Sequence, residues 1–137
     1  MAVESGIGAT ITIDDGNSGS GTGRDLSAYC TQLSFSTPRG SQDISSLNAS
    51  GMKRLLLRSD VNINATFVFD DGSNLSFDVF KTAGTDDGSR TVVIAHSSNT
   101  FTAECILTDT VYSIGADGSL TIQATFQLSN GTDGTWS

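Results

Sequence analysis

Apolar and polar residues alternate along several stretches of this chain, and a period of two residues predicts β-strands. The clearest stretch runs from Val61 to Asp70, and a second one runs from Leu120 to Leu128. Less regular patterns predict four further strands, at Gly8–Asp14, Asp25–Ser36, Arg90–His96 and Phe101–Ile114. The strand at Arg90–His96 is almost continuously apolar, which favours coverage on both faces, and we expect a kink near Asp109 in the strand that follows.

One segment, about residues 73–83, has the period of an α-helix. Its apolar residues are Leu75, Val79 and Phe80, with Phe77 on the flank. Ser73 or Asn74 is the predicted N-cap, and Lys81 lies near the C-terminal end, where a cation favours the helix dipole. One short helix among six strands predicts a mainly β fold, namely a β-sandwich or partial barrel with the helix at one end. A chain of 137 residues is expected to form a single domain.

Two stretches carry neither pattern. Residues 17–24, NSGSGTGR, have the composition of a flexible surface loop. Residues 37–60 are expected to form a long inter-strand loop, and loops of this length in compact domains are usually functional or disordered. This loop holds four of the seven basic residues, Arg39, Lys53, Arg54 and Arg58, around the apolar run Leu55, Leu56 and Leu57. Because a solvated loop does not need three consecutive leucines, the stretch is a candidate contact surface.

The charge balance limits the possible partners. Seven basic and fifteen acidic residues give a net charge of −8. Tight binding of nucleic acid uses lysines and arginines against phosphates, and this chain has few of them. No apolar run approaches the roughly 20 residues that a membrane-spanning helix needs, so no membrane partner is expected.

The residues that usually carry catalysis or bind metals are sparse, so we expect neither an enzyme nor a cofactor or metal. His96 is the single histidine, and no G-x-S-x-G motif accompanies it. The acidic stretches 70–72 and 86–88 lack the spacing and the closing Glu of a calcium loop, so we interpret them as turns. Cys30 and Cys105 are too few to form a zinc site with His96. The first residues, MAVESGIGAT, lack the pattern of an export signal, which predicts a reducing cytosol and two free thiols.

Two of the predicted strands have a polar face without charge. The residues of this face are Asn62, Asn64 and Thr66 in one strand, and Thr121, Gln123, Thr125 and Gln127 in the other. Soluble monomers usually protect exposed sheet surfaces and edges with charged residues, lysine above all. We therefore interpret these residues as facing a neighbouring subunit or the lumen of a water-filled channel. The alternative is an ordinary solvated face that happens to be uncharged.

The order of several pieces resembles the major tail (tail tube) protein of long-tailed, non-contractile bacteriophages. The segment Asp25-Leu26-Ser27-Ala28-Tyr29 is similar to an early D-[LI]-S-x-Y strand of that family. A long loop then ends at Arg58-Ser59-Asp60, before the alternating strand. The segments DDGSNLSFDVF, RTVVIA and ADGSLTIQATFQLSNGTDGTW follow in the same order as in the family. The resemblance covers about residues 25–136, whereas the Gly- and Ser-rich residues 17–24 are not part of the family pattern.

The resemblance implies a structural protein of a siphovirus-type virion, assembled in the host cytoplasm. Such proteins are β-sandwiches with a flanking helix, and they form hexameric rings whose sheets join into one barrel around a lumen. The rings stack into a tube through which DNA passes into the host without tight binding. Implied partners are further copies of the chain and the tape measure, tail terminator and distal tail proteins. Residues 37–60 would then be the stacking loop, and residues 1–24 would be a mobile arm that orders on assembly.

Other functions remain open at the level of sequence. A tail terminator or a capsid decoration protein would share the fold and the tendency to assemble. A secreted β-sandwich that binds carbohydrate or protein would be expected to carry an exposed aromatic platform, and this chain has one tryptophan, Trp136.

Overall fold

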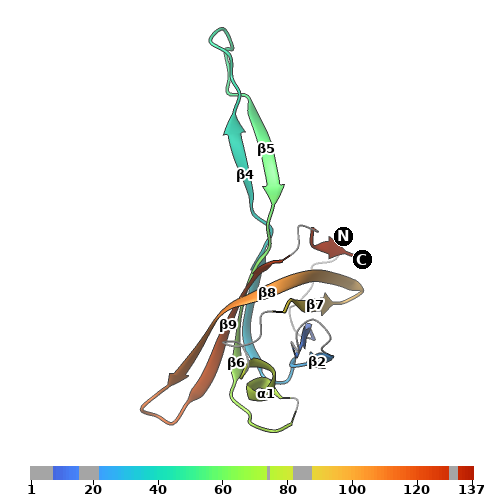
Figure 1. Cartoon of the computed structure of the whole chain (residues 1–137), viewed down its shortest axis with the longest axis vertical. Helices are drawn as coiled ribbons and strands as arrows, with labels where there is room; N and C mark the ends of the chain where they lie inside the picture. The colour runs from blue at the N-terminus through green and yellow to red at the C-terminus, as the bar shows by residue number, and fades with distance from the viewer. Residues whose placement is uncertain (1–7, 16–21, 74, 82–87, 130–132) are drawn as a thin grey trace.

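The computed structural model describes residues 8–15, 22–73, 75–81, 88–129 and 133–137. The fold is mainly β with one short helix among these residues, as the alternation predicted (Figure 1). The elements in chain order are β1 (Thr10–Asp14), β2 (Gly23–Asp25), β3 (Cys30–Ser36), β4 (Arg39–Asp43), β5 (Arg54–Ser59), β6 (Asn62–Val68), α1 (Ser76–Phe80), β7 (Arg90–His96), β8 (Asn99–Ile114), β9 (Leu120–Leu128) and β10 (Thr135–Trp136).

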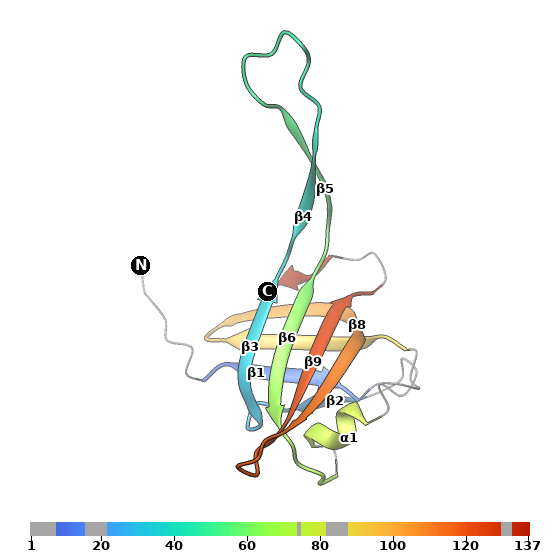
Figure 2. The ribbon, with the colours of Figure 1, turned by 90° about the vertical axis from the view of Figure 1, so that its left-hand side faces the viewer.

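The body of the molecule is a sandwich of two antiparallel layers that share the long strand β8. One layer holds β2, β1, β7 and the first half of β8, and the other holds the second half of β8 with β9, β6 and β3. Figure 2 shows the strands of the two layers crossing at a steep angle, with α1 near the lower end of the body. β10 pairs with β8 at Phe101 and Thr102 and thereby extends the first layer.

The core lies between the two layers. Its largest apolar side chains are Phe67, Phe80, Phe101 and Phe126, all fully buried. The ring centroid of Phe80 lies 5.2 Å from that of Phe67 and 6.4 Å from that of Phe126, so α1 is fixed to the core through this side chain.

Most of the predicted strands are confirmed. β7 and β9 occupy the predicted residues, and the register of β8 shifts between Leu107 and Asp109, where we expected a kink. The expected coverage of both faces of β7 is wrong. Val92 and Ile94 are buried, whereas Val93 and Ala95 are only partly buried, so the described residues bury one face of this strand more fully than the other.

The predicted strand Asp25–Ser36 is wrong at its start, since residues 26–29 form a turn between β2 and β3. Asp25 Oδ1 accepts a hydrogen bond from Ser27 N at 2.9 Å, and Leu26 O accepts one from Tyr29 N at 3.0 Å. Ser27 Oγ in turn accepts one from Ile11 N at 3.0 Å. An Asp that binds the backbone two residues on favours a turn over a strand, and this local chemistry outweighs the alternation.

α1 is shorter than the predicted helix at 73–83, and its N-cap residue is Leu75 rather than Ser73 or Asn74. Leu75 makes no side-chain capping bond. The preceding turn replaces the cap, because Asp70 O accepts from Phe77 N at 3.1 Å. Residues 74, 82 and 83 lie outside the described residues.

The expectation of a mobile arm over residues 1–24 is wrong for residues 10–14. These residues form β1, which pairs with β7 and β2, and the side chains of Ile11 and Ile13 are buried in the core. Gly23 and Arg24 belong to β2. The remaining parts of the predicted arm and of the loop 17–24, namely residues 1–7 and 16–21, lie outside the described residues.

Residues 37–60 contain two strands where we expected a loop. β4 and β5 pair with each other and form a hairpin that projects from the body along the long axis of the molecule (Figures 1 and 2). The register pairs Ser41 with Leu56 and Asp43 with Arg54, and it shifts between Arg39 and Ser41. Because neither face of this hairpin packs on a core, its sequence lacks the alternation that identifies the other strands.

The buried guanidinium of Arg90 joins α1 to the sheet. Arg90 is 1% exposed, and its Nη1 donates to Val79 O of α1 at 2.6 Å and to Asp14 O of β1 at 3.5 Å. A cation is favourable at this place because the carbonyls in the last turn of a helix lack backbone donors.

Replacing Arg90 by Met should therefore destabilise the fold while roughly preserving its volume. Both carbonyls would lose a donor, and each unsatisfied buried group costs roughly 1–3 kcal/mol, so we expect the free energy of unfolding to fall by about 3 kcal/mol. Urea denaturation followed by circular dichroism measures this change. Arg24→Met is the matched control, because the Arg24–Asp15 pair (3.2 Å) is partly exposed and should contribute less than about 1 kcal/mol. Equal effects of the two substitutions would contradict the role given to Arg90.

Candidate functional site

The two sets of uncharged residues predicted from the sequence lie on one face of the second layer. β6 and β9 are neighbours, and their register places Asn62 opposite Gln127, Asn64 opposite Thr125, and Thr66 opposite Gln123. Thr125 Oγ1 donates a hydrogen bond to Asn64 Oδ1 at 3.1 Å. Thr121 continues the same row opposite Val68. The side chains between them point to the core, as Ala65, Ala124 and Phe126 show by their burial.

β3 adds a third row to this surface, which the sequence analysis missed. Its residues Gln32, Ser34 and Ser36 pair with Thr66, Asn64 and Asn62 of β6 and are exposed. The alternation of these residues with Leu33 and Phe35 was the signal that could have identified them. We call this surface the neutral face; it consists of Gln32, Ser34, Ser36, Asn62, Asn64, Thr66, Thr121, Gln123, Thr125 and Gln127.

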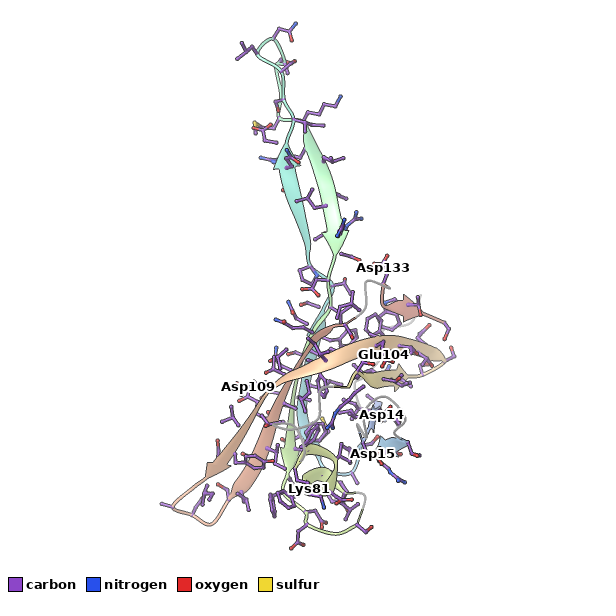
Figure 3. All side chains as sticks on the ribbon, viewed as in Figure 1. Asp14, Asp15, Lys81, Glu104, Asp109 and Asp133 are labelled. Atoms are coloured by element: carbon purple, nitrogen blue, oxygen red, sulfur yellow. The ribbon has the colours of Figure 1, made fainter. Side chains whose placement is uncertain are left out.

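The second half of β8 borders the neutral face on the other side. Val111 and Ser113 lie opposite Gln123 and Thr121, and Asp109 lies opposite Thr125. Figure 3 places Asp109 where β8 passes from one layer to the other. Asp109 is the one charged side chain among the described residues on these four strands that shares this face.

Both outer edges of this layer lack a strand partner among the described residues. β3 pairs with β6 alone, and residues 106–114 of β8 pair with β9 alone. The edge strand β3 contains no charged residue and no proline, and the β8 edge contains one charge, Asp109. An unprotected sheet edge exposes backbone donors and acceptors, so both edges can pair with another strand.

The β4–β5 hairpin exposes apolar side chains on both of its faces. Leu55, Leu56 and Leu57 are 51%, 59% and 44% exposed. The hairpin also exposes Ile44, Leu47 and Met52, so it carries half of the twelve large exposed apolar residues that the described chain has. A two-stranded hairpin without a core is at best marginally stable alone in water, so these exposed residues form a candidate contact surface.

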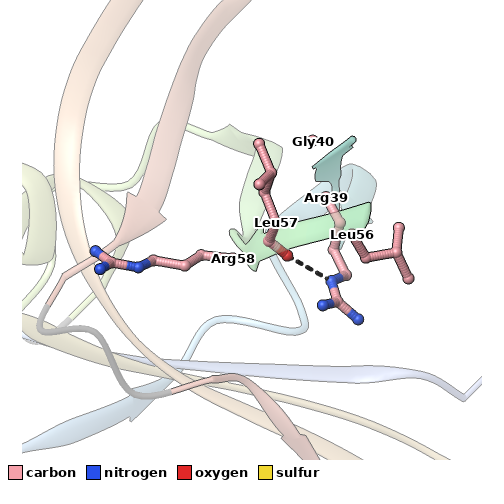
Figure 4. Close-up of a pocket in the computed structure, with 5 residues that line it drawn as sticks. All are labelled: Arg39, Gly40, Leu56, Leu57 and Arg58. Carbon is pink, nitrogen blue, oxygen red and sulfur yellow. Dashed lines mark hydrogen bonds between the residues drawn. The ribbon is translucent and has the colours of Figure 1, made fainter. Parts of the chain in front are cut away.

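An open groove lies at the base of the hairpin. Its volume is about 700 Å³, and Arg39, Gly40, Leu56, Leu57 and Arg58 line it. Arg39 Nε donates to Leu57 O at 2.9 Å, whereas the guanidinium of Arg58 extends to the other side of the strand (Figure 4). The structure thus gathers these predicted residues at one place. It puts Lys53, Arg54 and Leu55 nearer the hairpin tip, where Arg54 lies opposite Asp43.

The C-terminal segment holds the root of the hairpin. Ser59 Oγ, at the end of β5, donates to Asp133 Oδ1 at 2.6 Å. The ring of Trp136 lies 5.8 Å from that of Phe35 in β3 and 5.2 Å from that of Phe101 in β8. Asp60 N donates to Pro38 O at 2.9 Å and closes the base of the hairpin itself. These contacts fix the direction in which the hairpin leaves the body.

Solved structures of tail proteins share this architecture. The chain of a gene transfer agent tail, from an empty particle refined with C6 symmetry, superposes with a TM-score of 0.75 and 17% identity over 98% of this chain and 99% of that chain. The native gene transfer agent virion gives a TM-score of 0.77 and 14% identity with the same two coverages. The tail tube of SPP1 gives 0.73 and 10% identity over 98% of this chain and 79% of that chain. No protein-family model and no curated protein matches the sequence.

This chain has the tail-tube fold. The low sequence identities mean that the likeness concerns the fold itself, and it extends over nearly the whole chain, hairpin included.

The titratable groups of the described residues form no candidate metal site. No group of three or more His, Cys, Asp or Glu side chains is placed to hold a metal ion there. Burial and the charges of Glu104 and Asp60 raise the pKa of Cys105 to about 12, and burial also raises the pKa of Cys30. Both thiols are free and remain protonated at neutral pH, which makes them poor nucleophiles. No described helix of the tail-tube fold has the length and apolar character to cross a membrane.

Trp136→Ala should loosen the hairpin of the tail-tube fold without unfolding the body. Aromatic pairs contribute roughly 0.5–1.5 kcal/mol each, and the substitution removes two of them. Opening the base of the hairpin should then cost less free energy, so the amide hydrogen of Asp60 should exchange about tenfold faster. Hydrogen exchange followed by mass spectrometry measures this, with amides of β6 and β9 as internal reference. An equal increase in the reference strands, or no change at the hairpin base, would contradict the role given to Trp136.

Proposed function

We propose that this chain is the structural subunit of a phage-like tail tube. Copies of the chain form hexameric rings, and the rings stack into a hollow tube through which DNA passes into a host cell. The similarity to the gene transfer agent tail and to the SPP1 tail tube over 98% of the chain supports this role. The C6 symmetry of the gene transfer agent tail supports six copies in a ring.

The neutral face with its two unprotected edges carries the proposal. Side-by-side pairing of the β3 edge of one copy with the β8 edge of the next extends the four-stranded layer from copy to copy. Repeated pairing of two different edges is a heterologous contact, which closes into a ring when the rotation between copies allows it. The layers then form one barrel wall, with the neutral face on its inner side.

The chemistry of the neutral face suits a conduit for DNA. Lysine or arginine on the wall would contact phosphates, and each such contact adds affinity and therefore drag. The amide and hydroxyl side chains of this face form hydrogen bonds with water and with each other, as Thr125 does with Asn64. DNA can pass such a wall without being held.

The β4–β5 hairpin supplies the contact between rings. It projects along the long axis of the molecule and exposes Leu55, Leu56 and Leu57, which a neighbouring ring would bury (Figure 1). Residues 1–7, which lie outside the described residues, are proposed to contribute a terminal arm to the same contact. This role is structural and not catalytic, and its setting is the virion tail of a siphovirus-type particle, assembled in the host cytoplasm. Tape measure, tail terminator and distal tail proteins would be the further partners.

Leu56→Asp should prevent ring stacking and leave the fold intact. The side chain is 59% exposed in the single copy, so the substitution costs the monomer little, whereas a carboxylate in an apolar interface carries a large desolvation penalty. Negative-stain microscopy and sedimentation velocity should detect rings or single copies in place of tubes, with an unchanged β-rich circular dichroism spectrum. Ser98→Asp, in the exposed β7–β8 turn and outside the hairpin, the neutral face and its two edges, controls for added charge. Tubes of normal length from the Leu56 variant would refute the role of the hairpin.

Lysines on the neutral face should slow the passage of DNA. Gln123 and Gln127 are exposed on this face, and replacing both by Lys adds two cations per copy to the proposed wall. We expect particles of normal tail length whose DNA ejection is slower and strongly dependent on salt concentration. Gln123→Glu/Gln127→Glu is the matched control, and it should not slow DNA ejection. Normal ejection kinetics in the lysine variant would place the neutral face elsewhere than in the lumen.

A further inference from the structure

The hairpin region differs in charge from the rest of the chain. Residues 37–60, which include the hairpin, contain four basic and two acidic residues, whereas the rest of the chain contains three basic and thirteen acidic residues. Among the described residues, no ion pair joins Lys53, Arg54 or Arg58 of the hairpin to a carboxylate. The hairpin is therefore an unmatched basic projection on an acidic body.

The opposite end of the molecule combines carboxylates with exposed apolar side chains. Two turns meet there: the β6–α1 turn with Asp70 and Asp71, and the β8–β9 turn with Asp117. The backbone bond from Phe69 N to Leu120 O (3.1 Å) joins these two regions. Figures 1 and 2 both place this end at the bottom of the view and the hairpin at the top.

The apolar part of this end comes from the last residues of β8. Tyr112 is 43% exposed and Ile114 is 81% exposed, and the ring of Tyr112 lies 6.4 Å from that of Phe77 in α1. Lys81 of α1 pairs with Asp78 at 2.6 Å, so its charge is matched locally. We call Asp70, Asp71, Tyr112, Ile114 and Asp117 the acidic end.

We propose that the hairpin of one copy docks on the acidic end of the next copy. This inference rests on the proposed function, since it names the surface that the hairpin meets when rings stack. The arginines of β5 meet carboxylates of the acidic end, and the leucines of the same strand cover Tyr112 and Ile114. Basic side chains of the hairpin thus meet acidic side chains of the next copy, and apolar side chains meet apolar ones, within one contact.

The positions of the two surfaces give the assembly a direction. They lie at opposite ends of the molecule, so each copy uses its hairpin on one neighbour and its acidic end on the other. A head-to-tail contact of this kind repeats without closing and produces a tube that grows along one axis. Pairing of two hairpins with each other would bring like charges together, which disfavours a closed dimer of rings.

Nucleic acid is a less suitable partner for the hairpin. Its arginines stand beside exposed leucines, which phosphates do not cover, and the acidic body repels a polyanion. A free acidic surface of a second copy matches both features.

A charge exchange between the two surfaces tests the proposal. Arg54→Glu/Arg58→Glu reverses the hairpin, and Asp71→Lys/Asp117→Lys reverses the acidic end. Each double variant should form rings but should lower the fraction of protein in tubes about tenfold or more, measured by sedimentation and negative-stain microscopy. The variant with all four substitutions keeps the net charge of the natural chain and should recover tubes to within about threefold.

A control variant keeps the outcomes apart. Arg24→Glu/Ser98→Asp/Asn99→Asp changes the net charge as much as the hairpin reversal but lies outside both the hairpin and the acidic end, and it should leave tube formation unchanged. Equal loss in this control, or no recovery in the fourfold variant while its circular dichroism spectrum is unchanged, would overturn the proposal. Failure of the natural chain to form rings or tubes under any condition would overturn the proposed function as well.

A photo-crosslinker at Leu56 tests the contact without changing charge. In assembled natural protein, the crosslink should reach a peptide of another copy that contains Tyr112 to Asp117 or Asp70 to Lys81. A crosslink to a second hairpin or to the neutral face would overturn the proposal. A crosslink from Leu56 to added duplex DNA would assign the hairpin to nucleic acid instead.

Discussion

The bend of β8 is the feature on which the rest of the structure depends. Residues 99–105 pair with β7 and residues 105–114 pair with β9, so one continuous strand belongs to both layers. The register shift between Leu107 and Asp109 makes this change of direction possible, since a bulge increases the local twist of a strand. The crossing of the layers encloses the phenylalanine core, and the same bend frees the second half of β8 as an edge.

The hairpin shows how a small body can support a long projection. β4 and β5 have no core of their own, so their direction depends on the root, where Trp136, Phe35 and Phe101 stack and Ser59 bonds to Asp133. The exposed leucines make the free hairpin costly in water, and in the proposed tube another copy would cover them. Stability of the single copy and strength of the proposed assembly would therefore depend on different residues.

The strands of the body could be predicted from the sequence because their alternation reflects a core. Ile63, Ala65 and Phe67 are buried while Asn62, Asn64 and Thr66 face outwards, and the same rule identifies β9. The rule fails where no core exists, as in β4 and β5, and where local side-chain bonds prevail, as at Asp25 and Ser27. It also cannot reveal which strands are neighbours. The neutral face is a single surface because β3 pairs with β6 and β6 with β9, and the alternation in each strand does not show this. The acidic end likewise depends on two turns that are distant in sequence and meet in the fold.

Asp109 has a consequence for a channel lined by the neutral face. In a ring of identical copies, its carboxylate would recur at one height of the wall, while the rows of amides and hydroxyls above and below carry no charge. Each ring would then contribute one thin band of negative potential, and screening limits its reach to about 10 Å at moderate salt. A DNA molecule moving along the tube would cross a periodic series of weak barriers, each centred on a bend in β8. Mobile cations would collect at these bands, so that the spacing of the rings would also set the spacing of the counterions.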